Sequence, residues 1–427
     1  MNITKRGLVL SATAVMLTSV TVIGAGIHLS SQASFRQSPK ELIDEVWQVI
    51  DKRYVDATFN QQDWSAIRRE YLNRKYTTDQ EAYDAIREML KTLDDPYTRF
   101  MDPEEFRNMQ IDTSGELTGV GIQLTQDEET KELVVISPIE DTPAFNLGIQ
   151  AKDVITQIDG QSTEGMDLNQ AVNLIRGPVG SEVTLTIRRG EQETDYTIKR
   201  ARIEIHPVRY SMQENDIGKV GYIRLNQFSA NASAEMREAI QDLEKQNVAG
   251  YILDLRANPG GLLFASIEIA RMWLENGTIV STVDRIGETD RQVANHNDLT
   301  DKPLVILVDG GSASASEILS GALQDNQRAV LVGTKTFGKG LVQSVQSVGN
   351  GAGLAVTIAK YFTPNGRDIN HEGIVPDILV DLTDEQKEKL REDRSLIGTL
   401  ADPQYAKALE ILKQEVASQA RTQAHSK

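Results

Sequence analysis

Two short segments combine serine, lysine and glycine in patterns that suit acyl-transfer chemistry. Residues 309–317 read Asp-Gly-Gly-Ser-Ala-Ser-Ala-Ser-Glu and directly follow the apolar run 303–308. Small residues let a substrate backbone approach, and a serine at a helix N-terminus gains from the positive end of the helix dipole as an alkoxide forms. Composition alone does not choose the nucleophile among Ser312, Ser314 and Ser316.

Lys339 is the better candidate for the base that a serine nucleophile needs. Residues 336–340 read Thr-Phe-Gly-Lys-Gly and follow the apolar run 330–332, so the lysine is expected in tightly packed backbone. A lysine with a pKa of about 10.4 is no base at neutral pH, so burial must lower it. The histidines that could replace it lie in no glycine-rich setting: His206, His296 and His371.

A third segment could stabilise the oxyanion of an acyl-transfer reaction. Residues 254–261 read Asp-Leu-Arg-Ala-Asn-Pro-Gly-Gly and end the apolar run 251–255. Such a loop can aim N–H groups at a developing negative charge, although alone it also fits a plain turn before a helix. The chain shows no clustered His-carboxylate spacing, so we expect no metal. The charged residues near these loops are interpreted as structural or ion-paired: Asp254, Arg256, Asp309, Glu317 and Asp325.

The elements that must position these loops are strands alternating with helices. From residue 203 to about 380, apolar runs alternate with amphipathic helical patterns, which predicts an α/β core with a largely parallel sheet and a site at the carboxyl ends of its strands. Residues 38–109 have helical spacing of apolar residues, and residues 114–200 have mainly strand-like spacing.

We therefore predict a multidomain α+β protein. Its expected parts are a leader at 1–33, a helical domain at 35–113, a β-rich domain at 114–200, an α/β core at 201–382, and a C-terminal helix with a polar tail at 383–427.

Composition limits the possible partners and compartments. The 427 residues carry 45 Lys and Arg against 62 Asp and Glu, a net charge of -17, and no basic stripe, so nucleic acid is not expected as a partner. The absence of cysteine excludes disulfides and thiolate nucleophiles. Lys5 and Arg6 precede an uncharged apolar stretch, residues 7–29, which predicts an export signal or a retained membrane anchor.

The β-rich segment resembles a PDZ domain. Residues 119–122 read Gly-Val-Gly-Ile, and residues 147–155 correspond to a characteristic PDZ segment, with Ala151-Lys152 where glycine is commonest before the aspartate. The resemblance implies that a peptide tail adds as an extra strand between residues 119–122 and a helix at 167–175. The binding residues it implies are Gly119, Val120, Gly121 and Ile122, with Arg176 coupling the domain to the active site.

The catalytic segments resemble the carboxyl-terminal processing (tail-specific) serine protease family. The resemblance rests on residues 311–317, 321–325 and 336–343, and it extends from Leu-Asp-Asp-Pro-Tyr-Thr at 93–98 to Gly-Ile-Val-Pro-Asp at 373–377. It implies a protease core with crotonase- and ClpP-like βα architecture. The site residues that it implies are Ser314 as nucleophile, Lys339 as base, Gln343 orienting the lysine amine, and the amides of Gly260 and Ala315 as the oxyanion hole.

The implied function is endoproteolysis without a cofactor, on exported or membrane proteins with flexible apolar C-terminal tails. The expected location is the periplasm, the thylakoid lumen or the outer face of the cell membrane, with membrane association through the N-terminal segment possible. Oligomeric state stays open. Two alternatives are a non-catalytic PDZ protein that binds tails without cutting them, and a crotonase-like acyl-CoA enzyme, which needs neither a PDZ module nor a Ser-Lys dyad.

Overall fold

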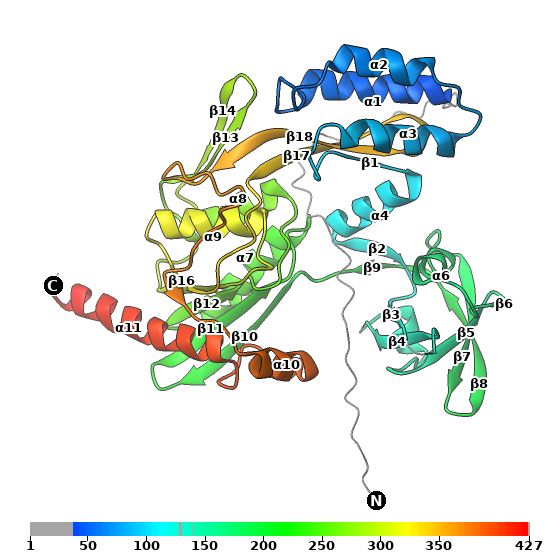
Figure 1. The fold of residues 1–427 in the computed structure, drawn as a ribbon. Coiled ribbons are helices and arrows are strands. Elements are labelled where there is room, and N and C mark those ends of the chain that lie inside the picture. The colour runs from blue at the N-terminus through cyan, green and yellow to red at the C-terminus, as the bar shows by residue number, and fades with distance from the viewer. Residues whose placement is uncertain (1–36, 128–129, 140, 426–427) are drawn as a thin grey trace, which may run out of the picture. The chain divides into compact units, whose positions relative to one another are not determined.

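A computed structural model describes residues 37–127, 130–139 and 141–425. The expected leader lies outside these residues. The chain divides into two compact units, one formed by residues up to Asn108 together with residues from Pro207 onward, and the other by Met109–His206 (Figure 1). Within the described ranges, no helix combines the length and apolarity needed to cross a bilayer.

The larger unit contains a mostly parallel sheet with helices on both faces. Its strand order is β10-β11-β12-β15-β16-β19, and only the β10-β11 pair is antiparallel. The bounds are β10 (Val208–Asn215), β11 (Gly218–Leu225), β12 (Gly250–Asp254), β15 (Leu304–Val308), β16 (Val330–Gly333) and β19 (Ile378–Leu379), with helices α7 (Ala232–Lys245), α8 (Leu263–Trp273), α9 (Ala315–Asp325), α10 (Asp384–Glu392) and α11 (Pro403–His425).

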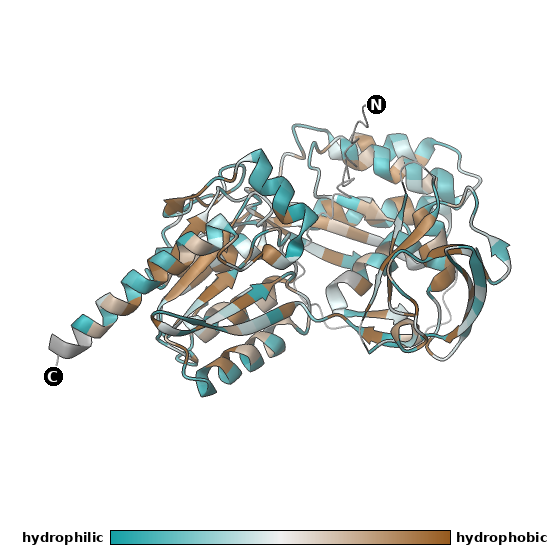
Figure 2. Cartoon of the chain, turned by 90° about the horizontal axis from the view of Figure 1, so that it is seen from below, coloured by the Kyte–Doolittle hydropathy of each residue, from teal (hydrophilic) through white to brown (hydrophobic). Residues whose placement is uncertain are grey.

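Alternate residues of the central strands face different layers, as the period of a strand requires. Leu253 and Ile306 pack in the cluster with α7, α8 and α9, whereas Ile252 and Leu307 pack in the cluster with Tyr405 and other residues of α11. In Figure 2 the helix that ends at the label C alternates hydrophobic and hydrophilic residues, as expected for a helix with one face on a sheet. The predicted α/β core is confirmed.

A second, antiparallel sheet of the same unit was not predicted from the sequence. It has the order β1-β18-β13-β14, with β17 also paired to β18. Its strands are β1 (Arg99–Met101), β13 (Thr278–Asp284), β14 (Gly287–Val293), β17 (Leu341–Ser347) and β18 (Gly353–Phe362).

The N-terminal helices pack on this second sheet. Leu42, Ile50 and Ile86 share one hydrophobic cluster with Leu354 and Val356 of β18. Capping boxes fix two helix starts, with Ser38 and Glu41 at α1 and Thr78 and Glu81 at α3. The helices are α1 (Pro39–Arg53), α2 (Trp64–Asn73) and α3 (Asp79–Lys91), followed by α4 (Pro103–Ser114), which crosses the boundary between the units.

The smaller unit is β-rich, as predicted. A sheet with the order β3-β4-β5-β7-β8 encloses a core that includes Val135, Ile155 and Leu185, and α6 packs on it through Ala171 and Ile175. The elements are β2 (Glu116–Gly119), β3 (Ile122–Gln126), β4 (Leu133–Pro138), α5 (Pro143–Asn146), β5 (Val154–Ile158), β6 (Gln161–Ser162), α6 (Leu168–Ile175), β7 (Glu182–Arg189), β8 (Gln192–Lys199) and β9 (Ala201–Glu204).

Candidate active site

Ser314 occupies a strained turn between β15 and α9. Its backbone has φ 54° and ψ -111°, and its side chain is buried. A non-glycine residue held in such a conformation costs about 1–3 kcal/mol and is typical of functional positions. A sharp strand-to-helix turn is also how α/β-hydrolase enzymes present a serine nucleophile.

The two neighbouring serines have structural partners. Ser312 donates its hydroxyl to the carbonyl of Leu255 at 2.8 Å, and Ser316 donates to the carbonyl of Asn258 at 2.9 Å. Both bonds attach the serine loop to residues 254–261. The positive φ distinguishes Ser314 from its two neighbours, which composition alone could not do.

Lys339 is buried with 2% of its surface exposed, between two glycines that allow close packing. A Cβ on Gly340 would lie 2.7 Å from the amide nitrogen of Asn370, and Gly338 has φ +93°. Burial lowers the pKa of Lys339 from 10.5 to about 7. The positive charge of Arg99 is the second contribution to this lowered pKa.

Three other groups near Lys339 favour its charged form and so oppose the lowering of its pKa. The carboxylates of Asp95 and Glu317 raise the pKa of Lys339 against the effect of burial. The ring of Tyr97 lies with its centroid 4.6 Å from the lysine Nζ, which favours the charged form of the amine. With a pKa of about 7, roughly half of the amine is neutral near pH 7.

Glu317 holds the segments of Ser314 and Lys339 together. Its Oε2 accepts the backbone amides of both residues at 2.9 Å. Its Oε1 accepts the Gly338 amide at 2.7 Å and the Thr336 hydroxyl at 2.5 Å. Burial raises the pKa of this carboxyl, although these four donors oppose the shift. The sequence indicated a structural or ion-paired role for Glu317. Its Ser-x-x-Glu capping spacing could have indicated the bond to the Ser314 amide, but not the bonds to residues 336–339.

Tyr361 of β18 is a second side chain that contacts the backbone of both Ser314 and Lys339. Its hydroxyl lies against the carbonyl of Lys339 and 3.2 Å from the carbonyl of Ser314. Its side chain is 1% exposed, and burial raises its pKa well above the usual value, so it is a neutral donor. No sequence signal pointed to Tyr361, because β18 itself was not predicted.

Gln343 lies at a register shift in β17, directly after Val342. Its side chain is 1% exposed, and its Nε2 lies 3.5 Å from the hydroxyl of Thr357. Its Oε1 is buried and has no hydrogen-bond partner among the described residues. A buried amide oxygen without a donor is costly, so Gln343 has a buried acceptor that is available to a further donor.

Gly260 lies against Ser314. A Cβ at this position would be 2.6 Å from the carbonyl of Ala313, 2.9 Å from the amide nitrogen of Ala315 and 3.0 Å from the Cβ of Ser314, and φ is +100°. Only glycine therefore fits. The Gly260 amide donates to Oδ1 of Asn258 at 2.9 Å, whereas Ala315 is the first residue of α9, where an amide has no carbonyl partner within its helix.

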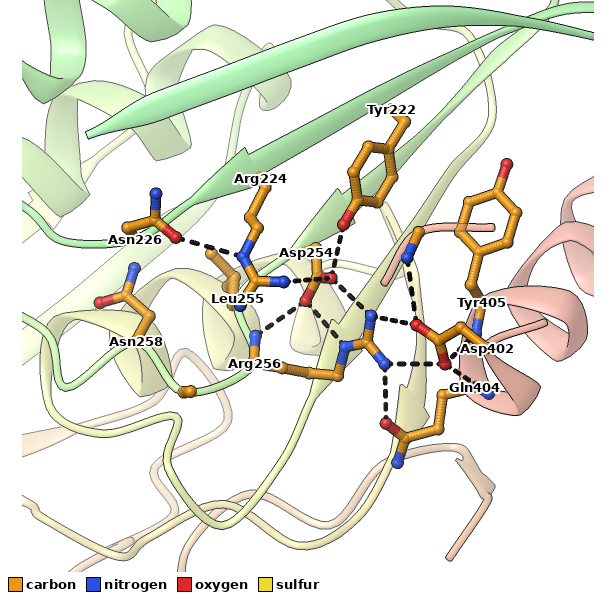
Figure 3. Close-up of polar contacts among 12 residues, drawn as sticks. Tyr222, Arg224, Asn226, Asp254, Leu255, Arg256, Asn258, Asp402, Gln404 and Tyr405 are labelled. Carbon is orange, nitrogen blue, oxygen red and sulfur yellow. Dashed lines mark hydrogen bonds and ion pairs between the residues drawn. The ribbon is translucent and has the colours of Figure 1, made fainter. Parts of the chain in front are cut away.

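The loop before Gly260 is held by a buried ion network that reaches the C-terminal helix (Figure 3). Arg256 contacts Asp254 at 2.6 Å and Asp402 at 2.7 Å, and its Nη1 also donates to Gln404 at 3.0 Å. Burial alone would raise the pKa of Asp254, but Arg256 and Arg224 hold it below its usual value. Residues at the start of α11, for which no role was assigned from sequence, therefore support the loop at residues 254–261.

Asp402→Ala is expected to lower the free energy of unfolding by about 3–5 kcal/mol, because it leaves part of the buried Arg256 guanidinium uncompensated. Urea unfolding followed by circular dichroism measures the change. Asp384→Ala is the matched control, since Asp384 is exposed and lies 3.6 Å from Lys387. Equal stability of the two variants would contradict a supporting role for the network.

A cavity of about 650 Å³ adjoins these loops within the larger unit. Leu262, next to Gly261, and Val342, next to Gln343, both line it. Its other apolar lining residues include Ile267, Val280 and Ile358, and its charged ones include Lys52, Arg53, Glu268, Arg271, Asp284 and Arg285. The cavity is large enough for an apolar side chain and lies next to Gly261 and Gln343.

The peptide-binding residues expected in the smaller unit gather near the edge strand β3. Gly121 has φ +83°, and a Cβ there would lie 2.2 Å from the hydroxyl of Thr142, so glycine is required. Ile122 begins β3, which pairs with β4 alone among the described strands. A Cβ on Gly119 would lie 4.0 Å from Cγ of Arg176, whereas Val120 is a core residue.

The three histidines considered as alternative bases lie at the surface. His206, His296 and His371 are all exposed. Within the described ranges, no group of three or more His, Asp or Glu side chains could hold a metal ion.

Comparison with known proteins decides the family. The model of peptidase family S41 matches residues 219–380, a PDZ domain model matches 134–189, and the Tricorn protease C1 domain model matches 35–91. The carboxyl-terminal-processing protease of Picosynechococcus sp. is 48% identical over 380 residues, with 88% of this chain and 90% of the relative covered. This chain belongs to peptidase family S41.

Two further comparisons place this S41 peptidase among the carboxyl-terminal-processing proteases. The carboxyl-terminal-processing protease of Synechocystis sp. is 46% identical over 93% of the chain and 92% of its own length. A solved structure titled photosystem II D1 C-terminal processing protease is 37% identical, covers 86% of this chain and all of its own, and has a TM-score of 0.57. The S41 chain is thus a serine peptidase of the carboxyl-terminal-processing family with a PDZ domain, as the sequence resemblance predicted.

Proposed function

We propose that this S41 peptidase cleaves exported or membrane proteins near their C-termini with a Ser314-Lys339 dyad. The observation that carries the proposal is the pair of backbone amides, from Ser314 and Lys339, that donate to one buried oxygen of Glu317. This shared anchor fixes the two chain segments against each other. The lowered pKa of Lys339, about 7, supports its use as a base.

In the proposed mechanism the neutral amine of Lys339 takes the proton of the Ser314 hydroxyl as its oxygen attacks the peptide carbonyl. The lysine then returns the proton to the leaving amine, and water releases the acyl group by the same route in reverse. The amides of Gly260 and Ala315 stabilise the oxyanion. Because the Gly260 amide donates to Asn258, the oxyanion must share or replace that acceptor.

Gln343 is proposed to accept a hydrogen bond from the lysine amine through its unpartnered Oε1. With one N–H of the amine fixed in this way, its lone pair is directed toward the serine. The adjoining cavity is proposed to take an apolar side chain of the substrate.

Substrate tails are proposed to add to the edge strand β3 of the PDZ domain, beside α6. Edge strands offer unpaired backbone groups, and PDZ domains bind peptides by this kind of strand addition. Gly119, Val120, Gly121, Ile122 and Arg176 are the residues proposed for this site. Residues 1–33 are proposed to direct export, in line with chloroplastic relatives such as carboxyl-terminal-processing peptidase 2 of Arabidopsis thaliana.

Tail dependence tests this function. We expect an unfolded reporter that ends in Ala, Val and Leu to be cleaved at least about tenfold faster than the same reporter ending in Asp and Glu, since a charged tail loses apolar burial worth over 1.4 kcal/mol. Cleavage is followed by electrophoresis and mass spectrometry. Equal cleavage of both reporters would contradict tail recognition, and tight binding without cleavage would favour a non-catalytic PDZ protein.

A further inference from the structure

A line of buried polar groups runs from Gln343 to the turn before β1. The Nε2 of Gln343 lies 3.5 Å from the hydroxyl of Thr357 in β18. That hydroxyl lies 3.4 Å from the hydroxyl of Thr98, which donates to Oδ2 of Asp95 at 2.6 Å. Gln343, Thr357 and Thr98 are at most 4% exposed, and Asp95 is half-buried.

The carboxylate at the end of this line gives it a direction. A carboxylate accepts hydrogen bonds and does not donate them, so it takes the single hydroxyl proton of Thr98. The oxygen of Thr98 is then an acceptor, and it already receives the backbone amide of Thr357 at 3.0 Å. Because the single proton of Thr98 goes to its nearer acceptor, Asp95 at 2.6 Å, we assign the 3.4 Å contact to the proton of the Thr357 hydroxyl, which leaves the Thr357 oxygen to accept from Gln343.

This direction decides which end of the Gln343 amide is available to the Lys339 amine in the proposed mechanism. The amide nitrogen is held at Thr357, so Oε1 is the end that remains for the lysine amine. A reversed amide would present an N–H donor and would compete for the lone pair that must take the serine proton. The orientation of an amide is otherwise easily reversed, because its two ends have nearly the same shape.

We propose that Asp95, Thr98 and Thr357 are positioning residues for catalysis, which set the orientation of the Gln343 amide and through it the lone pair of Lys339. The proposal rests on the Ser-Lys mechanism proposed above. It gives residues 95–98 a second contact with the site, beside the ring of Tyr97 over the lysine Nζ.

Thr98→Val tests the proposal, since valine keeps the shape of threonine and removes the hydroxyl. We expect kcat on the apolar-tailed reporter to fall about 10–100-fold, the usual effect of removing a group that orients a catalytic residue, with KM changed less than about twofold. Thr98→Ser should restore kcat to within about threefold of wild type. Thr163→Val is the matched control and should keep wild-type kcat. Thr163 has a buried hydroxyl in the smaller unit, which donates to the carbonyl of Ile155.

A double-mutant cycle separates positioning from general destabilisation. In a Gln343→Ala background, Thr98→Val should have no further effect on kcat, because the amide that it orients is gone. The proposal is overturned if Thr98→Val keeps wild-type kcat or if Thr98→Ser is as slow as Thr98→Val. It is also overturned if the double variant loses the product of the kcat losses of Gln343→Ala and Thr98→Val. Full activity of Lys339→Met would instead refute the dyad, so the two failures are distinguishable.

Discussion

Lys339→Met is expected to lower kcat by at least about 10⁴-fold, the scale of losing a base that acts as one unit with its nucleophile. Methionine has a similar length, fits the same buried space and cannot accept a proton. Because burial penalises the lysine charge, the variant should be at least as stable as wild type at pH 7. Lys335→Met is the control, since Lys335 is exposed in the same segment.

The pH dependence gives an independent check on the lysine. Its pKa is lowered to about 7, so kcat/KM should rise about tenfold per pH unit below this value and level off above it. The unfolded chain holds this proton up to pH 10.5, so wild-type stability relative to Lys339→Met should rise between about pH 7 and 10.5. A stable Lys339→Met variant that cleaves at more than a hundredth of the wild-type rate would show that another group is the base.

Ser314→Ala is expected to abolish cleavage, with a loss of at least about 10⁴-fold, while tail binding is retained. The backbone strain at Ser314 also predicts that a substitution which abolishes activity can raise stability. The free energy of unfolding of Ser314→Gly should be about 1 kcal/mol higher than that of Ser314→Ala. Glycine tolerates φ 54°, whereas alanine does not. Steady-state cleavage and urea unfolding measure the two effects.

The control for the serine is Ser320→Ala, which removes a buried hydroxyl from the same helix, where it lies 3.4 Å from the carbonyl of Glu317. This variant should cleave within about threefold of the wild-type rate. Loss of activity in Ser320→Ala as large as in Ser314→Ala would mean that helix α9, and not the nucleophile, had been damaged. A stable and active Ser314→Ala would exclude this residue as nucleophile.

The sequence allowed prediction of those parts of the molecule that depend on local pattern. Apolar runs such as residues 304–308 marked the parallel strands, and glycine clusters marked the loops that follow them. The small residues around Ser314 and Lys339 were visible for the same reason, since close backbone approach requires them. The alternation of strands and helices then predicted that these loops meet at one sheet edge.

The second sheet and the supporting contacts could not be predicted in this way. Strand β14 (Gly287–Val293) reads Gly-Glu-Thr-Asp-Arg-Gln-Val, which has almost no apolar pattern. Asp402 supports Arg256 across 146 residues, and Thr98 meets Thr357 across 259 residues. Such contacts depend on the packing of distant segments, and a single sequence carries no local signal for them.

Mass spectrometry of one reporter incubated with the wild-type protein without residues 1–33, and with its Ser314→Ala variant, tests the central claim most directly. The reporter is an unfolded protein with an apolar, uncharged C-terminal tail. We predict that the wild type releases fragments cut near that C-terminus and that the Ser314→Ala variant binds the same reporter and releases none. Identical fragments from both proteins, or cuts that ignore the position of the tail, would contradict the account.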